Sequence, residues 1–412
     1  MPHSLTRFLL GVRAIAALPS WRAQQSLIIL SEAVIAFLAL FLLESGVSEM
    51  RTLGLLAAIY LATGLAIRLH RLHLGKHPRI VPVALMVLAT AGSIATLASP
   101  TPESLVLAAF GILTLKDLAT TSAIGDIHRA ADRIGSAPSQ LVSTGMLIGA
   151  ILVMAALWGS GQILTTSPNT WAALVALFCA GFLVMLLRGG VKISGSRAGR
   201  EVPQLARLYC YLSMTYNATS FVGKRFVLPL AIAQMARGLG LGADAYTSLG
   251  VVLSLLVLLG LATRGLSGTM GDPRVMMFGG FFTGLSLWLV LGLLLGGQSV
   301  GWMQACFSMI CLLVIEISNK VWTLGFVECL RCTARQEGGK DAADVEIACF
   351  GFFMEVKGYG AGLGFLVAMA ALTLEFSALG PAACLGLLLG AGIWMQTQPR
   401  MPAVDTPDPT RT

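Results

Sequence analysis

Apolar residues run through this 412-residue chain in stretches of about 17 to 25 residues, separated by short polar connections. A helix needs about 20 such residues to cross the ~30 Å hydrocarbon core of a bilayer. The short alternating strands of a transmembrane barrel are absent from the pattern. We therefore predict an all-α polytopic membrane protein with twelve spans, at 25–44, 51–67, 80–98, 103–124, 139–159, 171–187, 207–235, 246–263, 275–296, 302–330, 346–373 and 378–396.

The longest polar connection, rich in Gly, Ser and Arg, lies between the sixth and seventh spans. It predicts two six-helix halves, as in many secondary transporters built from repeated units. The expected organisation is an N-terminal segment at 1–24, a first half at 25–187, a linker at 188–206, a second half at 207–396 and a tail at 397–412.

The positive charges alternate between the two sides of this arrangement. Twenty-one of the 28 basic residues fall in the termini and the even-numbered loops, whereas the opposite side has only Arg51 and Arg237. Basic loops mark the cytoplasmic face of a membrane protein. The sequence therefore predicts cytoplasmic termini and a bacterial inner-membrane location. The net charge of +8 therefore reflects the orientation of the chain in the membrane, and we expect no nucleic-acid partner.

Three local features have a second interpretation. The N-terminal segment predicts an interfacial helix rather than a cleaved signal, because Arg13 interrupts its apolar stretch; a mitochondrial presequence is the alternative. Cys329 and Cys332 form a CxxC without a second ligand pair. The histidines between the second and third spans lie among basic residues, which favours a solvated loop over a metal site. We predict neither a cofactor nor a resident metal.

Charged residues also occur inside the apolar spans. A charge at the bilayer centre costs about 2.5–3.5 kcal/mol on insertion scales, so such residues usually face a cavity or a partner. Four of the five affected spans are the first, fourth, seventh and tenth, which occupy equivalent positions in a bundle of repeated three-helix units. We therefore expect a central cavity. The charged residues are Glu32, Lys116, Asp117, Lys224, Arg225, Glu316, Lys320, Glu355 and Lys357.

These charges suggest distinct roles. Adjacent Lys224 and Arg225 have no acid within one turn, so they are the first candidates for recognising an anionic solute, together with Lys320, Lys116 and Asp117. Glu316 is the first candidate for ion coupling, followed by Glu355 and Glu32. The alternative is that Glu316 and Lys320, four residues apart, only neutralise one another along one helix face, and that Lys116 and Asp117 extend toward the membrane interface.

Two loops resemble those of the major facilitator superfamily, and the resemblance extends over all twelve spans. "GLSGTMGDPRVMMFGG" after the eighth span matches at Gly268, Asp272 and Arg274, and "GDIHRAADRIGSAPSQ" after the fourth matches at Asp126 and Arg133. The equivalent loop after the second span, "RLHRLHLGKHPRI", lacks the acid. The resemblance implies alternating access between two rocking halves. It implies gating roles for Asp272, Arg274, Asp126 and Arg133.

The predicted function is secondary active transport of a small anionic or zwitterionic solute, with a proton as the expected coupling ion. The expected partners are this solute, the coupling ion and the lipid bilayer, and the expected state is a monomer. The sequence leaves two alternatives open: a non-transporting membrane scaffold, or a carrier of a metal ion or metal chelate. We expect no enzymatic activity, because the spans contain no paired-His motif and no nucleophile–base arrangement.

Overall fold

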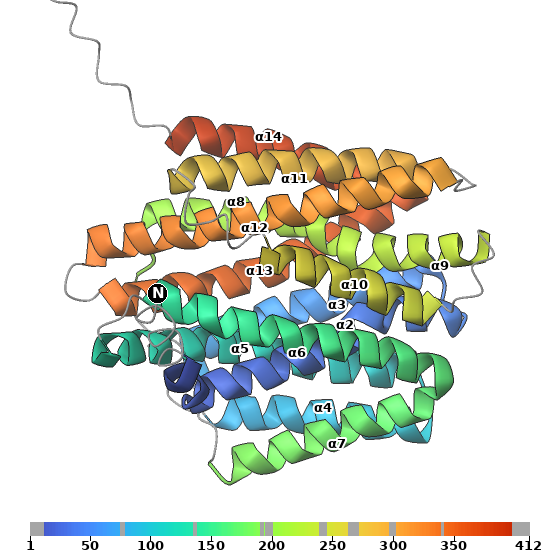
Figure 1. Ribbon diagram of the computed structural model, residues 1–412, viewed down its shortest axis with the longest axis horizontal. Helices are drawn as coiled ribbons and strands as arrows, with labels where there is room; N and C mark the ends of the chain where they lie inside the picture. Colours follow the sequence, from blue (N-terminus) through green and yellow to red (C-terminus); the bar gives the residue numbers. More distant parts are fainter. Residues whose placement is uncertain are drawn as a thin grey trace, which may run out of the picture.

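The computed structural model describes residues 12–74, 79–134, 138–189, 193, 201–238, 245–262, 272–295, 302–338 and 342–397. The elements in these ranges are helices that run side by side along the long axis of the molecule (Figure 1). The first group comprises α2 (Pro19–Glu44), α3 (Glu49–Leu69) with the π-helical turn η1 (His70–Leu74), α4 (Ile80–Ala98), α5 (Pro102–Ile134), α6 (Pro138–Thr166) and α7 (Pro168–Leu187).

The second group begins with a broken helix. Its members are α8 (Gln204–Val222), the π-helical turn η2 (Gly223–Val227), α9 (Leu228–Gly238), α10 (Ala245–Ala262), α11 (Pro273–Leu295), α12 (Trp302–Gly338), α13 (Ala342–Thr373) and α14 (Gly380–Thr397). Each of the twelve predicted spans corresponds to one helix, with α8, η2 and α9 together forming the seventh. The all-α fold with twelve helical segments is confirmed.

Local chemistry explains where several helices begin. Pro19, Pro102, Pro138, Pro168 and Pro273 each occupy a first helical position, where the missing N–H costs nothing and the fixed φ suits a helix. Nine of the described helices are long and apolar enough to cross a membrane, and Ala245–Leu259 is a shorter apolar helix. Large apolar side chains such as Leu177, Leu293 and Leu388 face outward, as hydrocarbon surroundings require.

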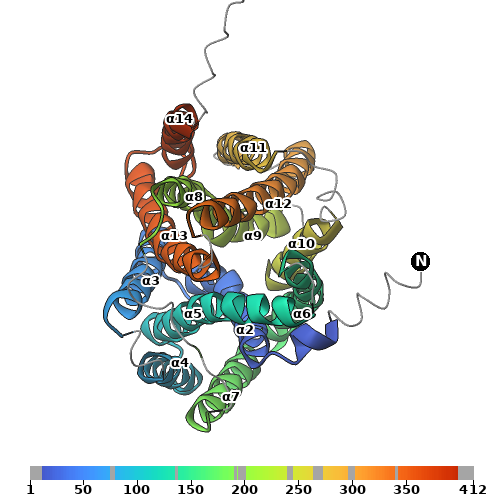
Figure 2. The ribbon, with the colours of Figure 1, turned by 90° about the vertical axis from the view of Figure 1, so that its left-hand side faces the viewer.

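The two groups of helices lie against each other along two seams (Figure 2). At one seam α3 packs on α13, where a Cβ at Gly358 would lie 2.8 Å from the backbone nitrogen of Gly64. At the other, α6 packs on α10, where a Cβ at Gly161 would lie 2.7 Å from the carbonyl oxygen of Tyr246. The absence of side chains at these glycines allows the backbones of the two groups to touch.

One end of the bundle carries most of the described basic residues. Helices α5, α7, α10 and α12 and the turn η1 have their C-terminal ends here, on the left of Figure 1. We call it the basic end. It corresponds to the side for which the charge pattern predicts a cytoplasmic location. Among its exposed residues are Arg79, Arg188, Arg207 and Arg335.

Part of the segment that was expected to precede the first span is helical. Residues 12–16 are helical, and α2 begins at Pro19 rather than at residue 25. Ile15 is fully buried against Ile127 and Ala130 of α5, together with Trp21. The first spanning helix therefore begins six residues before the start that the apolar pattern indicated. The tail at 398–412 and most of the linker at 188–206 lie outside the described residues.

Candidate functional site

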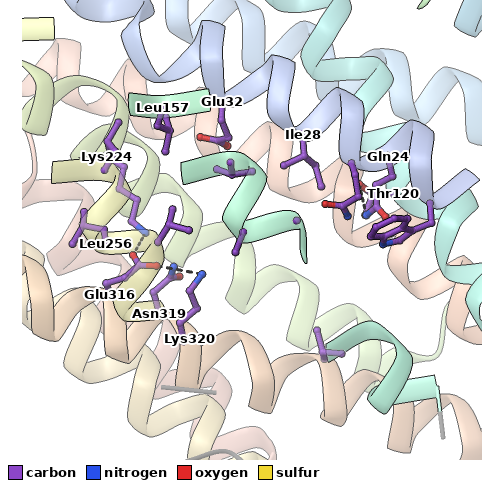
Figure 3. A pocket seen from close by; sticks show the side chains of 18 of the residues that line it. Gln24, Ile28, Glu32, Thr120, Leu157, Lys224, Leu256, Glu316, Asn319 and Lys320 are labelled. Carbon is purple, nitrogen blue, oxygen red and sulfur yellow. Dashed lines mark hydrogen bonds and ion pairs between the residues drawn. The ribbon is translucent and has the colours of Figure 1, made fainter. Parts of the chain in front are cut away.

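A cavity of about 450 Å³ lies between the two groups of helices. Its lining extends from Trp21, close to the basic end of α2, to Glu32 in the middle of the same helix, so it runs about 16 Å along the bundle. The lining residues of α5, α6, α10, α12 and α13 likewise lie between the middle of the bundle and the basic end. Figure 3 shows charged side chains gathered at the deep end and Gln24 and Thr120 farther along.

The deep end of the cavity is formed around the π-helical turn η2. This turn places the adjacent residues Lys224 and Arg225 on the cavity lining, where Lys224 reaches α12 and Arg225 reaches α2. Single π-helical turns within α-helices occur frequently at functional sites. Gly223 opens the turn, and a Cβ there would overlap the ring of Trp288, so glycine permits the turn to pack on α11.

Arg225 joins the two groups of helices. Its Nη2 atom donates hydrogen bonds to both carboxylate oxygens of Glu32, at 2.9 and 2.8 Å. The side chains are 14% and 23% exposed, so both remain in contact with the cavity. An Arg–carboxylate pair in such surroundings is a strong, charge-assisted interaction. The predicted recognition residue Arg225 and the predicted coupling candidate Glu32 are therefore direct partners.

Glu316 holds two lysines within the second group. Lys224 Nζ donates to Oε2 of Glu316 at 2.5 Å, and Lys320 Nζ lies 3.3 Å from Oε1. The intrahelical Glu316–Lys320 pair expected from the spacing is thus present. It is not the whole arrangement, because Lys224 arrives from another helix. The Glu316 side chain is only 7% exposed, so its charge depends on these two cations.

The charged groups of the cavity do not balance. Lys224, Arg225 and Lys320 contribute three cations to the deep end, and Glu32 and Glu316 contribute two carboxylates. Among the described residues of this layer, one positive charge therefore remains without a carboxylate of its own. A carboxylate or phosphate group entering the cavity would complete the charge balance.

Lys116 and Asp117 form a buried cluster with Lys357, close enough to the cavity for both lysines to interact electrostatically with Glu32. Asp117 Oδ1 accepts a hydrogen bond from Lys357 Nζ at 2.9 Å and lies 3.3 Å from Lys116 Nζ. Asp117 is 2% exposed, and none of the three residues lines the cavity. The structure therefore leaves these two predicted substrate residues outside the cavity lining that holds the other three. Their cluster connects α5 of the first group to α13 of the second.

Glu355 also lies apart from the cavity. It accepts two hydrogen bonds from Arg71, from Nη2 at 2.7 Å and from Nε at 3.1 Å, and Arg68 Nε lies 3.8 Å away. The guanidinium of Arg71 also covers the ring of Phe352 at 5.5 Å. Glu355 therefore has a strong partner on α3 and η1, which makes it an interhelical contact between the two groups.

The predicted gating residues lie near the basic end. Asp272 directly precedes α11 and accepts a hydrogen bond from the backbone N–H of Arg274 at 2.8 Å. Asp272 and Arg274 line a smaller cavity of about 250 Å³ with Tyr209 of α8 and residues of α12. Asp126 is half-buried on α5. The side chain of Arg133 and the position of Gly268 lie outside the described residues, so the predicted loop contacts are not tested.

Several cavity residues were not predicted from the sequence. Gln24 donates to the hydroxyl of Thr120 at 3.3 Å, and Gln25 and Asn319 also line the cavity. Toward the basic end, Arg331 donates to Glu346 at 3.0 Å. Gln24 was missed because the apolar pattern placed it before the first span. Asn319 directly precedes Lys320, and Thr120 lies one helical turn after Lys116; this proximity was the available clue.

Metal-ligating side chains do not gather in the part of the chain that the structure describes: no group of three or more His, Cys, Asp or Glu is positioned to hold an ion. Cys329 and Cys332 line the smaller cavity. The side chain of His73 and the position of His77 are outside the described residues. His70 is buried, and neither of its ring nitrogens has a hydrogen-bond partner among the described residues.

Comparison with known proteins identifies the fold. No protein-family model matches the sequence, and no curated protein matches it. Among solved structures, the nucleoside transporter NupG superposes with a TM-score of 0.64 at 13% identity, over 93% of this chain and 99% of that one. A point mutant of NupG gives 0.61 at 11% identity, over 92% and 99%. A D-xylose-proton symporter gives 0.59 at 12% identity, over 94% and 97%.

These similarities show the fold. The chain is a multi-pass α-helical membrane protein that shares the fold of these solved transporter structures.

Proposed function

We propose that this protein is a proton-coupled secondary active transporter of a small organic anion, working by alternating access. The observation that carries the proposal is the charged layer at the deep end of the cavity. It lies between the two groups of helices, and its Glu32–Arg225 pair joins them. A ligand that binds these charged side chains replaces some of their present ion pairs. Because one of those pairs connects the two groups of helices, ligand binding changes the contacts that set their relative position.

The charge balance favours an anion. Lys224 and Lys320 share Glu316, while Arg225 is held by Glu32. A solute carboxylate that binds Lys320 or Lys224 competes with Glu316 for its cation. When Glu316 loses a cationic neighbour, its protonated form becomes relatively more favourable. Solute binding and proton binding are thereby linked at one carboxylate, which is the requirement for symport.

The cavity lies on the basic end of the bundle, and the Gly161 seam lies toward the opposite end. With the basic end cytoplasmic, as the distribution of Arg and Lys predicts, this arrangement is an inward-facing conformation. The proposed organisation is two halves, at 25–187 and 207–396, that rock about the charged layer, with both termini on the cytoplasmic side.

Transport in proteoliposomes tests the proposal. Purified protein is reconstituted and assayed for uptake of radiolabelled lactate, benzoate and glutamate, with and without an imposed pH gradient. We expect gradient-dependent uptake of at least one anion, and its loss in Lys224→Ala/Arg225→Ala. Glu103→Gln, an exposed pair member 62% accessible to solvent, is the matched control. Absence of any uptake by folded protein would move the interpretation to the scaffold alternative.

A neutral polar solute is a second candidate. The structures of similar fold are a nucleoside transporter and a D-xylose-proton symporter. In this chain, Gln24, Gln25, Thr120 and Asn319 line the cavity and supply the amide and hydroxyl groups that bind hydroxylated solutes. Uridine and xylose belong in the same uptake assay. Uptake of either, with none of the anions, would replace the anion proposal.

A further inference from the structure

The cavity has two chemically different walls. On α6 its lining consists of Gly149, Ala150, Val153 and Leu157, and on α10 of Leu253, Leu256 and Val257. The charged and polar side chains of the lining come from α2, α5, η2 and α12. One wall is therefore apolar from Ala150 to Leu157, with the Gln25 amide lying against it at Gly149, and the other carries the cations and carboxylates.

The apolar wall extends along a large part of the cavity. Ala150 and Leu157 are seven residues apart on one helix, which corresponds to about 10 Å along the axis. Ile28 of α2 and Ile124 of α5 add apolar surface on the polar side, between the Glu32 layer and Gln24. A ligand whose charged end reaches Lys224 and Lys320 therefore has its remaining length against branched aliphatic side chains.

These surfaces set a requirement on the solute. A hydroxylated body placed against Val153, Leu157 and Leu256 would lose its hydrogen bonds with water and find no partners on that wall, at a cost comparable to an unmade hydrogen bond for each hydroxyl. An aliphatic or aromatic body gains free energy from the same contact, about 0.8 kcal/mol per buried CH₂ group. The apolar wall thus discriminates between anions of equal charge and length.

We infer that the cavity binds an amphipathic organic monocarboxylate, with its carboxylate at the Lys224–Lys320 cations and an aliphatic or aromatic body along the α6–α10 wall. This inference rests on the proposed transport function and names the solute class of the same site. It excludes polyhydroxylated anions such as sugar acids as the preferred solute.

The test is a matched pair of anions. Hexanoate and gluconate have the same number of carbons and the same charge and differ in the hydroxyl groups of the body. Their dissociation constants are measured by isothermal titration calorimetry on the purified full chain. We expect hexanoate to bind at least tenfold more tightly than gluconate. In the series butyrate, pentanoate and hexanoate, each added methylene should tighten binding about fourfold. Equal or tighter binding of gluconate overturns the inference.

Two controls separate specific binding from partition into the detergent. Hexanamide lacks the charge and should bind at least tenfold more weakly than hexanoate. Val257→Thr places a hydroxyl on the apolar wall at nearly constant volume. It should reduce the gain in affinity for each methylene added to the solute, and Val153→Thr tests the same effect at a second position. Val252→Thr, on the same helix but absent from the lining, should leave the gain unchanged. An unchanged gain in both wall variants also overturns the inference.

The outcomes distinguish the inference from the transport proposal. Chain-length-dependent binding without gradient-driven hexanoate uptake supports the solute class and contradicts transport. Uptake of lactate or glutamate, without preference for hexanoate over gluconate, supports transport and overturns the solute class. Binding of uridine or xylose with no binding of any carboxylate overturns both.

Discussion

Arg225 of η2 donates hydrogen bonds to both carboxylate oxygens of Glu32 on α2, 193 residues away in the sequence. The pair lines the cavity and connects the two groups of helices at mid-bundle. Two further ion pairs, Lys357 with Asp117 and Arg71 with Glu355, also connect one group to the other. Charges that are costly inside a bilayer are thus used at the contact between the groups.

Breaking the Glu32–Arg225 pair should destabilise the protein. Arg225→Met leaves the partly buried Glu32 carboxylate without its partner, and we expect a loss of about 2 kcal/mol in the free energy of unfolding. Replacing both residues, as Glu32→Gln/Arg225→Met, should cost less than the sum of the single changes. Denaturant unfolding in detergent measures the effect.

The exposed pair Arg51 and Glu103 provides the control for this cycle. Its side chains are 59% and 62% accessible, so removing it should change stability by less than about 1 kcal/mol. If the double variant loses as much stability as the two single variants together, within about 0.5 kcal/mol, Glu32 and Arg225 are not energetically coupled.

The two lysines at Asp117 should substitute for one another. Lys357 lies at 2.9 Å and Lys116 at 3.3 Å from the same oxygen, so either one neutralises the carboxylate when the other is removed. We expect Lys116→Met and Lys357→Met each to cost less than about 1 kcal/mol, and the double variant, which leaves Asp117 buried and unpaired, to cost about 3 kcal/mol or more. Thermal unfolding of the three variants is the measurement; a double variant as stable as the singles would refute the arrangement.

Gly223→Ala should disturb the charged layer through Trp288. The new Cβ would overlap three ring atoms of Trp288, a fully buried residue, so η2 or α11 has to move. Overpacking of this kind costs about 1–3 kcal/mol. We expect reduced stability together with weaker solute binding, because the displaced turn carries Lys224 and Arg225. Gly279→Ala is the control, since a Cβ there meets no atom within 4 Å; equal stability of both variants would argue against the expected clash.

Gly250→Ala should favour opening of the end opposite to the basic end. Its Cβ would lie 2.8 Å from the carbonyl oxygen of Leu157, where α10 of one group contacts α6 of the other. A strain of about 1.4 kcal/mol changes a two-state population about tenfold. In a background lacking the native cysteines, Asn319→Cys reports cavity access to a membrane-impermeant maleimide. We expect faster labelling from the opposite face.

Gly159→Ala is the matched change on α6, where a Cβ meets no atom within 4 Å. It should leave the labelling rate of the cavity cysteine unchanged. Equal labelling rates in Gly250→Ala and Gly159→Ala would show that the α6–α10 seam does not resist this opening.

Glu316→Gln should remove the dependence of uptake on the pH gradient. The amide cannot take up a proton, and its oxygen remains able to accept from Lys224 or Lys320, so solute exchange can continue without a driving force. The measurement is uptake with and without an imposed gradient, together with counterflow. Glu103→Gln should retain both activities. Gradient-driven uptake equal to that of the unmodified protein would exclude Glu316 from coupling.

The local sequence determined the helical architecture. Twelve apolar stretches predicted twelve helical segments, because a bilayer requires that each backbone polar group be satisfied within its own segment. Proline and polar connections marked the ends of these segments to within a few residues. The start of α2 and the ends of α5, α6 and α12 differ by six to ten residues, because amphipathic ends packed on neighbouring helices extend beyond the apolar stretch.

The sequence also singled out the charges within the spans, since their cost in hydrocarbon makes them exceptional. The structure places five of them, Glu32, Lys224, Arg225, Glu316 and Lys320, around one cavity, and leaves Lys116, Asp117, Glu355 and Lys357 outside its lining. Their functional roles remain predictions.

Only the tertiary structure decided which charges are partners. Helical spacing predicts contacts within a helix, such as Glu316 with Lys320, but partners from different helices depend on how the helices are rotated and staggered. Lys224 reaches Glu316 and Arg225 reaches Glu32 from adjacent positions of one π-helical turn. Asp117 and Glu355 face other helices at the same contact between the two groups. The apolar wall of α6 and α10 is likewise a tertiary feature, because valine and leucine in a membrane span look the same whether they face lipid or a cavity.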